Sequence, residues 1–103
     1  MTKSIYKFYW DCGRNGHLSG IFVASDKEIK EIIGEHIRFG EVLGKHSEIS
    51  GTLKKDDIEK LVDGELEKDF VEKFESLELD SGFNPLDYYE RMEHEEDEED
   101  EEN

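Results

Sequence analysis

A run of acidic residues near the C-terminus limits what this chain can fold into. Every residue in 93–102 is Asp or Glu, except His94. Charges this dense repel one another and bring no apolar surface to bury, so the segment is expected to be solvated and disordered. We therefore assign residues 1–89 to one small domain and residues 90–103 to an acidic tail. A domain of that size has little stability in reserve, because it buries only roughly 60–65% of its unfolded surface.

The net charge of the 103-residue chain is −16, and it is unevenly distributed. Residues 1–55 contain nine Lys or Arg and seven Asp or Glu, whereas residues 56–103 contain four and 22. Direct nucleic-acid binding is not expected, because neutralisation of phosphates by cations supplies most of the nonspecific affinity. The acidic half is better suited to approach a basic protein surface.

The compartment is predicted from three simple features. Cys12 is the single cysteine, so no internal disulfide forms. The N-terminus leads into an aromatic segment without the apolar region of a signal peptide. The longest apolar run, residues 21–24, is far too short to span a bilayer. We expect a cytoplasmic protein in a reducing environment, with no membrane association.

Alternating apolar residues predict two β-hairpins. In residues 5–12 the side chains of Tyr6, Phe8 and Trp10 share one face, and aromatic residues favour strands. Residues 18–24 are predicted to form the return strand, in which Gly20 marks a bulge or a close backbone approach. The second hairpin is predicted from residues 36–43 and 49–53, around a glycine-flanked polar turn.

A short helix is predicted between the hairpins. Ser25 and Glu28 have the spacing of a capping box, and Gly34 suits the position just after a helix end. The isoleucines between them are spaced for one helical face: Ile29, Ile32 and Ile33. Because a helix of about two turns is not stable alone, these isoleucines are expected to pack on the sheet beside Trp10.

A second helix is predicted over residues 65–77. Leu66, Phe70, Phe74 and Leu77 are spaced as one apolar stripe, which is the pattern of a helix that faces a core. Residues 56–63 fit either a helical turn or a short edge strand. The predicted class is α+β: two antiparallel hairpins forming one small sheet with a helix between them (ββαββ), then an amphipathic helix and the tail.

Two polar loops are the first candidate site. They are residues 13–17 and 44–48, and their turns converge if both hairpins lie in one sheet with the turns at one end. The candidate ligand-binding residues are Arg14, Asn15, His17, Lys45, His46, Ser47 and Glu48. Their cations, hydroxyl and turn amides suit a phosphate or carboxylate. The alternative is that polar residues simply populate turns. No phosphate-loop or dinucleotide motif is present.

An aromatic segment before the tail is the second candidate site. The candidate partner-binding residues are Phe83, Leu86, Asp87, Tyr88 and Tyr89. One interpretation is a linear motif that docks into a groove of a partner while the acidic tail steers the encounter. The alternative is that the segment folds back and closes the core.

The sequence gives little support for a catalytic site or a metal site. Cys12, His17, His36 and His46 match no zinc-ligand spacing. A nucleophile also needs a base and an orienting group within reach, and nothing in the sequence sets that geometry. We therefore expect no enzyme activity, no cofactor and no metal.

Two functions follow from these observations. The first is a non-enzymatic binding protein whose acidic half engages, and inhibits, a basic nucleic-acid-acting protein. In size and charge the chain is similar to toxin immunity proteins and phage-encoded inhibitors of host defence, although no motif supports that analogy. The second is a module that holds an anionic or nucleotide-like small molecule in the two polar loops.

Overall fold

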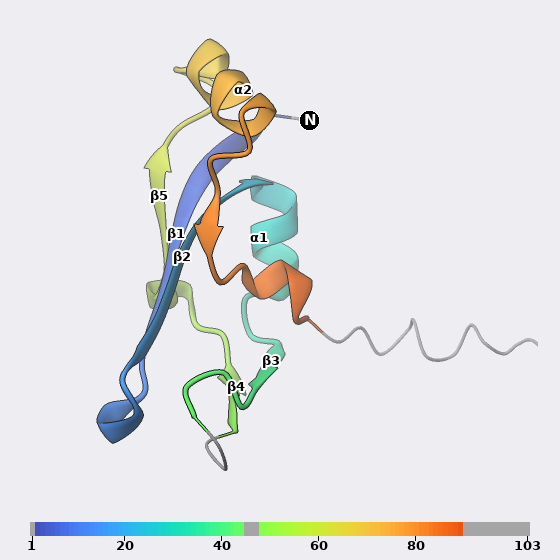
Figure 1. The fold of residues 1–103 in the computed structure, drawn as a ribbon. Helices are drawn as coiled ribbons and strands as arrows, with labels where there is room; N and C mark the ends of the chain where they lie inside the picture. The colour runs from blue at the N-terminus through green and yellow to red at the C-terminus, as the bar shows by residue number, and fades with distance from the viewer. Residues whose placement is uncertain (1, 45–47, 90–103) are drawn as a thin grey trace, which may run out of the picture.

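The computed structural model describes residues 2–44 and 48–89. The domain is a small α+β fold with two helices and antiparallel strands (Figure 1). The predicted class is confirmed, and within the described residues the order has one further strand before the second helix and another after it.

The main sheet has four strands in the order β5-β1-β2-β6. β1 (Lys3–Asp11) and β2 (His17–Ser25) form the predicted first hairpin, joined by the 3₁₀ turn η1 (Gly13–Asn15). β5 (Ile58–Val62) pairs with the other edge of β1, so the ambiguous segment is an edge strand. β6 (Ser81–Gly82) pairs with β2.

The second hairpin corrects the prediction of a single sheet. β3 (His36–Gly40) and β4 (Ile49–Thr52) pair with each other in a separate two-stranded sheet, and Ile37 of β3 also forms an isolated antiparallel bridge with Tyr89. In the main sheet β1 already lies between β2 and β5, and the hairpin instead packs its apolar side against the sheet face. The Phe39 ring lies 5.5 Å from Phe8 and 5.4 Å from Trp10, measured between ring centroids.

α1 (Asp26–Ile32) forms as the local sequence predicts. Ser25 Oγ accepts a hydrogen bond from the Glu28 amide at 3.1 Å, and the Glu28 carboxylate accepts one from the Ser25 amide at 2.9 Å. This closes the capping box and satisfies two amides that the helix itself leaves without partners. Gly34 has a φ of +92°, the left-handed conformation that favours glycine after a helix end.

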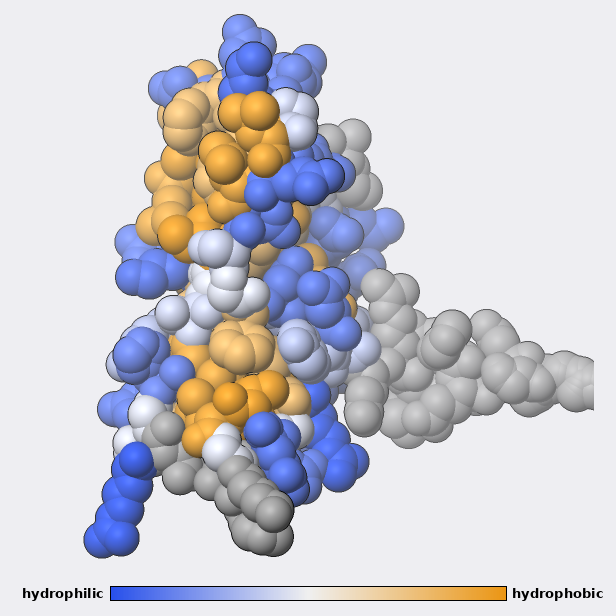
Figure 2. Space-filling view, in the orientation of Figure 1, coloured by the Kyte–Doolittle hydropathy of each residue, from blue (hydrophilic) through white to orange (hydrophobic). Residues whose placement is uncertain are grey.

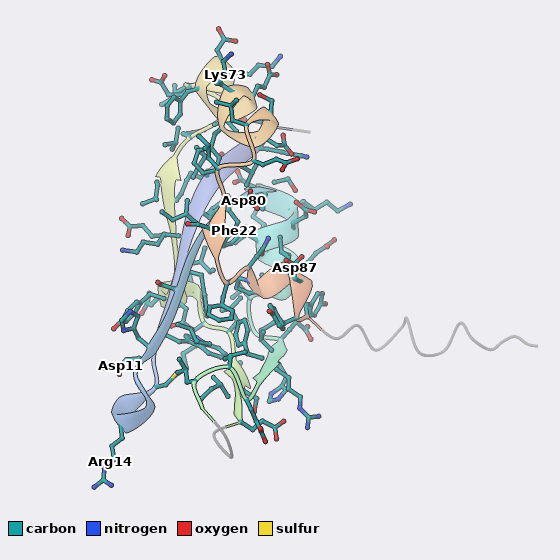
Figure 3. The ribbon with its side chains drawn as sticks, viewed as in Figure 1. Asp11, Arg14, Phe22, Lys73, Asp80 and Asp87 are labelled. Carbon is teal, nitrogen blue, oxygen red and sulfur yellow. The ribbon has the colours of Figure 1, made fainter. Side chains whose placement is uncertain are left out.

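The core lies on one face of the main sheet. Alternate residues of β1 and β2 point into it, and Phe22 in Figure 3 marks its position. The most deeply buried side chains there come from both hairpins, α1 and the segment after β4: Phe8, Leu18, Phe22, Ile32, Ile37 and Leu53. Trp10, Ile29 and Ile33 pack at its border, which confirms that Trp10 and the helix isoleucines share the core.

α2 (Lys68–Ser76) lies at the end of the molecule where β1 begins (Figure 1). It is shorter than predicted, and its buried side chain is Val71. Lys3 Nζ lies 3.0 Å from Glu75 Oε2, which adds one exposed ion pair between β1 and α2. Such an exposed pair adds little to stability, so burial of Val71 matters more for holding α2 against the rest of the domain.

Candidate functional site

The first polar loop lies at the end of the molecule far from α2 (Figure 1). Arg14 and Asn15 belong to η1, and the Arg14 side chain points away from the rest of the protein (Figure 3). The His17 ring instead stacks on Tyr9, with centroids 5.4 Å apart.

Part of the predicted loop site lies outside the described residues. These are Lys45, His46 and Ser47. Glu48 is described, and its carboxylate pairs with the guanidinium of Arg38 rather than with a residue of the first loop.

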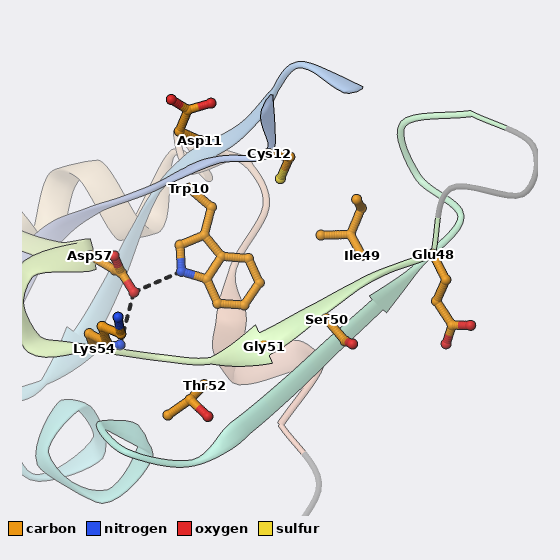
Figure 4. A pocket seen from close by; sticks show the side chains of 10 residues that line it. All are labelled: Trp10, Asp11, Cys12, Glu48, Ile49, Ser50, Gly51, Thr52, Lys54 and Asp57. Carbon is orange, nitrogen blue, oxygen red and sulfur yellow. Dashed lines mark hydrogen bonds between the residues drawn. The ribbon is translucent and has the colours of Figure 1, made fainter. Parts of the chain in front are cut away.

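A pocket of about 530 Å³ lies between the end of β1, strand β4 and the 3₁₀ turn η2 (Lys55–Asp57); we call it the strand-end pocket (Figure 4). Trp10 forms one wall. Its Nε1 donates a hydrogen bond to Asp57 Oδ2 at 2.7 Å, and the Lys54 amide donates to the same oxygen at 2.8 Å. A buried indole usually needs such a partner, so these bonds hold the wall in place.

The charged lining of the strand-end pocket is mainly acidic. Among the described lining residues, Asp11, Glu48 and Asp57 carry carboxylates and Lys54 carries the one ammonium group. This lining repels an anion rather than attracting it. An anion site here would depend on residues 45–47, and it stays a prediction.

Cys12 also lines the strand-end pocket. Burial, followed by the neighbouring charge of Asp11, raises the pKa of the thiol. The thiol is therefore protonated at neutral pH, whereas a nucleophilic cysteine needs a lowered pKa. In the part of the chain that the structure describes, no group of three or more His, Cys, Asp or Glu is placed to hold a metal ion.

The aromatic segment before the tail folds back on the core. Its centroid distances to Phe39 are 5.7 Å for Phe83 and 4.6 Å for Tyr88. Leu86 and Tyr89 are also half-buried, while Asp87 is exposed. The second interpretation of this segment therefore describes the structure, in which its apolar side chains are partly buried against the core. Its role as a docking motif stays a prediction.

Gly20 makes this folding back possible. A Cβ atom at that position would lie 2.0 Å from the Phe83 carbonyl oxygen, far inside contact distance. The Phe83 amide also donates to the Ser19 carbonyl at 2.9 Å. The predicted close approach at Gly20 is confirmed, and it is what ties the segment after β6 to β2.

The structure also has a surface that sequence reasoning missed. Several large apolar side chains on and beside α2 are exposed, and we call them the α2 surface. Their exposed fractions are 43% for Leu61, 80% for Leu66, 56% for Phe70, 58% for Leu77 and 53% for Leu79. Figure 2 shows hydrophobic groups gathered at this end of the molecule, with hydrophilic groups around them.

The sequence does contain the apolar stripe behind the α2 surface, but the stripe was assigned to the wrong environment. The stripe that includes Leu66, Phe70 and Leu77 was predicted to face the core, whereas α2 packs through Val71 on another side of the helix. Phe74 of the same stripe is half-buried. The other three side chains of the stripe remain exposed, which is unusual for apolar groups of this size.

Carboxylates surround the α2 surface. Residues 63–80 contain eight Asp or Glu and two Lys, and nearly all of these side chains are exposed. One lysine, Lys68, lies 3.9 Å from Glu72 on the same helix, a weak exposed pair. The field over the apolar groups is therefore strongly negative.

No family model matches the chain, and the comparisons with curated proteins and with solved structures give no significant match. None of the helices in residues 2–44 and 48–89 combines the length and apolar character needed to cross a membrane.

Proposed function

We propose that this protein is a non-enzymatic binding protein whose acidic half engages a basic partner protein. The observation that carries the proposal is the α2 surface, where large exposed apolar side chains lie among carboxylates. Large apolar side chains that remain in contact with water are unfavourable, and burying them against a partner lowers the free energy. The surrounding charge selects the partner, because complementary charge speeds encounter and like charge is rejected.

The chemistry of the α2 surface defines the kind of partner. A segment with its own apolar stripe and flanking Lys or Arg, such as an amphipathic basic helix, satisfies both the apolar and the acidic groups. Proteins that act on nucleic acids carry such basic surfaces, because they must neutralise phosphates. Occupying that surface would inhibit the partner by competing with its nucleic acid. The analogy with immunity proteins and phage inhibitors of host defence is consistent with this role, as an analogy of size and charge.

The proposal is tested with a synthetic amphipathic basic helix and a scrambled peptide of the same composition. We expect the ordered peptide to bind more tightly, and its affinity to fall with added salt because the ionic part is screened. The double variant Phe70→Ser/Leu77→Ser removes apolar groups while keeping every charge, and it should lose most of the binding. Tyr9→Ser is the matched control, since Tyr9 is 46% exposed but lies outside the α2 surface.

Equal binding of both peptides would show that charge alone acts and would overturn the role of the α2 surface. Loss of binding in the Tyr9 control, or retention in the double variant, would do the same. A functional test follows with any basic partner obtained: the wild-type protein should displace nucleic acid from it, and the double variant should not.

A further inference from the structure

A second hollow lies between α1, η2 and β5, and we call it the α1 groove. Its volume is about 460 Å³. Its apolar floor includes Ile29 from α1, Ile33 directly after α1 and Ile58 from β5. The polar groups at its rim come from three separate elements: Lys30, Lys55 and Lys60. Small-molecule sites have this volume and this combination of an apolar lining with a few polar groups.

The charge of the α1 groove is opposite to that of the whole protein. The chain carries −16, yet no carboxylate is among the described residues that line this groove. Within residues 2–44 and 48–89, neither Lys30 nor Lys55 forms an ion pair. Three lysines facing one apolar hollow repel one another, and an anion bound there would relieve that repulsion.

A hydrogen-bonded cluster, of which only Tyr6 is buried, holds one wall of the groove in place. The Tyr6 hydroxyl donates a hydrogen bond to the Asp26 carboxylate. Lys60 Nζ lies 3.1 Å from Asp26 Oδ1 and 5.9 Å from the centroid of the Tyr6 ring. Asp26 therefore pairs with Lys60 and positions it. The Asp26 charge also acts on Lys30 without a direct ion pair, so Lys30 and Lys55 can both still contact a ligand.

We propose that the α1 groove binds an amphipathic monocarboxylate, with its apolar body on the isoleucines and its carboxylate at the lysine rim. Lysine ammonium groups act as point charges, and they can bind a single carboxylate without the planar two-bond pairing that arginine provides. The proposal is independent of the α2 surface, because it uses different residues and a ligand of opposite charge. A purely structural role, in which lysine stems cover the isoleucines, predicts no preference for an anion.

The test is an NMR titration of backbone amides with three probes of equal chain length: octanoate, octanol and octylamine. Octanoate is expected to shift the amides of Ile29, Ile33 and Ile58 at the lowest concentration. Octylamine is expected to bind most weakly, because the lysines repel it. Equal binding of octanoate and octanol would overturn the proposal, as would octanoate shifts confined to other parts of the domain.

Variants locate the charge that matters. Lys30→Gln/Lys55→Gln should weaken octanoate binding by at least about tenfold while leaving octanol binding unchanged. The matched control is Lys7→Gln/Lys27→Gln, which removes the same charge from exposed lysines outside the groove and should leave octanoate binding unchanged. An equal loss in both double variants would mean that only net charge acts, and the groove assignment would fail. Phe70→Ser/Leu77→Ser should bind octanoate normally even if it no longer binds the basic peptide.

Discussion

The two helices differ in whether their apolar residues are buried. α1 is the shorter one, yet its isoleucines pack against an aromatic sheet face, and Ile32 is fully buried. α2 has the clearer apolar stripe and leaves most of it in solvent. The charges differ as well, with lysines at the rim of the α1 groove and carboxylates around α2. An apolar stripe therefore indicates that a helix has a face to bury, but it does not say whether the partner lies in the same chain.

The largest expected effect on stability comes from α1, the helix whose isoleucines pack in the core. Ile32→Ala should lower the free energy of unfolding by about 2–4 kcal/mol, because it removes buried methyl groups and leaves a cavity. Phe70→Ala, a larger truncation on α2, should change it by less than about 0.5 kcal/mol, because Phe70 is already more than half exposed. Urea unfolding followed by Trp10 fluorescence measures both. Similar losses would mean that the α2 stripe is buried in solution.

The helix caps provide a smaller contrast. Ser25→Ala removes the side chain that caps α1 and should cost about 1 kcal/mol. Glu67 occupies the same position before α2 but makes no capping hydrogen bond from its side chain, so Glu67→Ala is the matched control and should be close to neutral. Thermal unfolding of the two variants under one set of conditions tests this. A larger cost at Glu67 would contradict the difference in capping.

Low pH should reduce the stability of the folded protein through Asp26, the first residue of α1. Hydrogen bonds from Tyr6 and Lys60 lower the pKa of the Asp26 carboxyl in the folded state. A lowered folded pKa stabilises the protein above the unfolded value of about 3.9, and this contribution is lost as pH falls through the folded value. Because Asp26 is largely exposed, the contribution should be below about 1 kcal/mol. Asp26→Asn should therefore be less stable than wild type at neutral pH, and the difference should shrink below about pH 4. A difference that is constant with pH would exclude this linkage.

The smallest expected effect concerns the acidic tail. Truncation after Met92 removes nine of the 29 acidic residues and should leave the melting temperature unchanged or slightly raised, because self-repulsion falls. The same truncation should weaken binding of the basic peptide at low salt more than at high salt. A fall of more than a few degrees in melting temperature would show that the tail contributes to folding.

The sequence alone determined the features that depend on neighbouring residues. The alternating aromatics of β1 and the Ser25–Glu28 capping box act over a few positions, and both formed as predicted. The close approach at Gly20 was also visible as a missing side chain in a strand, although its neighbour, Phe83, was not.

Only the tertiary structure decided the features that depend on competition for apolar surface. It placed the β3–β4 hairpin on the sheet face rather than at its edge, and it paired β5 with β1 across nearly fifty residues of chain. It also left most of the α2 stripe exposed while it buried Val71 of the same helix. The candidate sites followed the same rule. Lys30 lies 25 residues before Lys55 in the sequence. It shares the α1 groove with Lys55 and Lys60 only because α1, η2 and β5 meet around one hollow. Local propensity acts along the chain, whereas burial is decided by the whole fold at once.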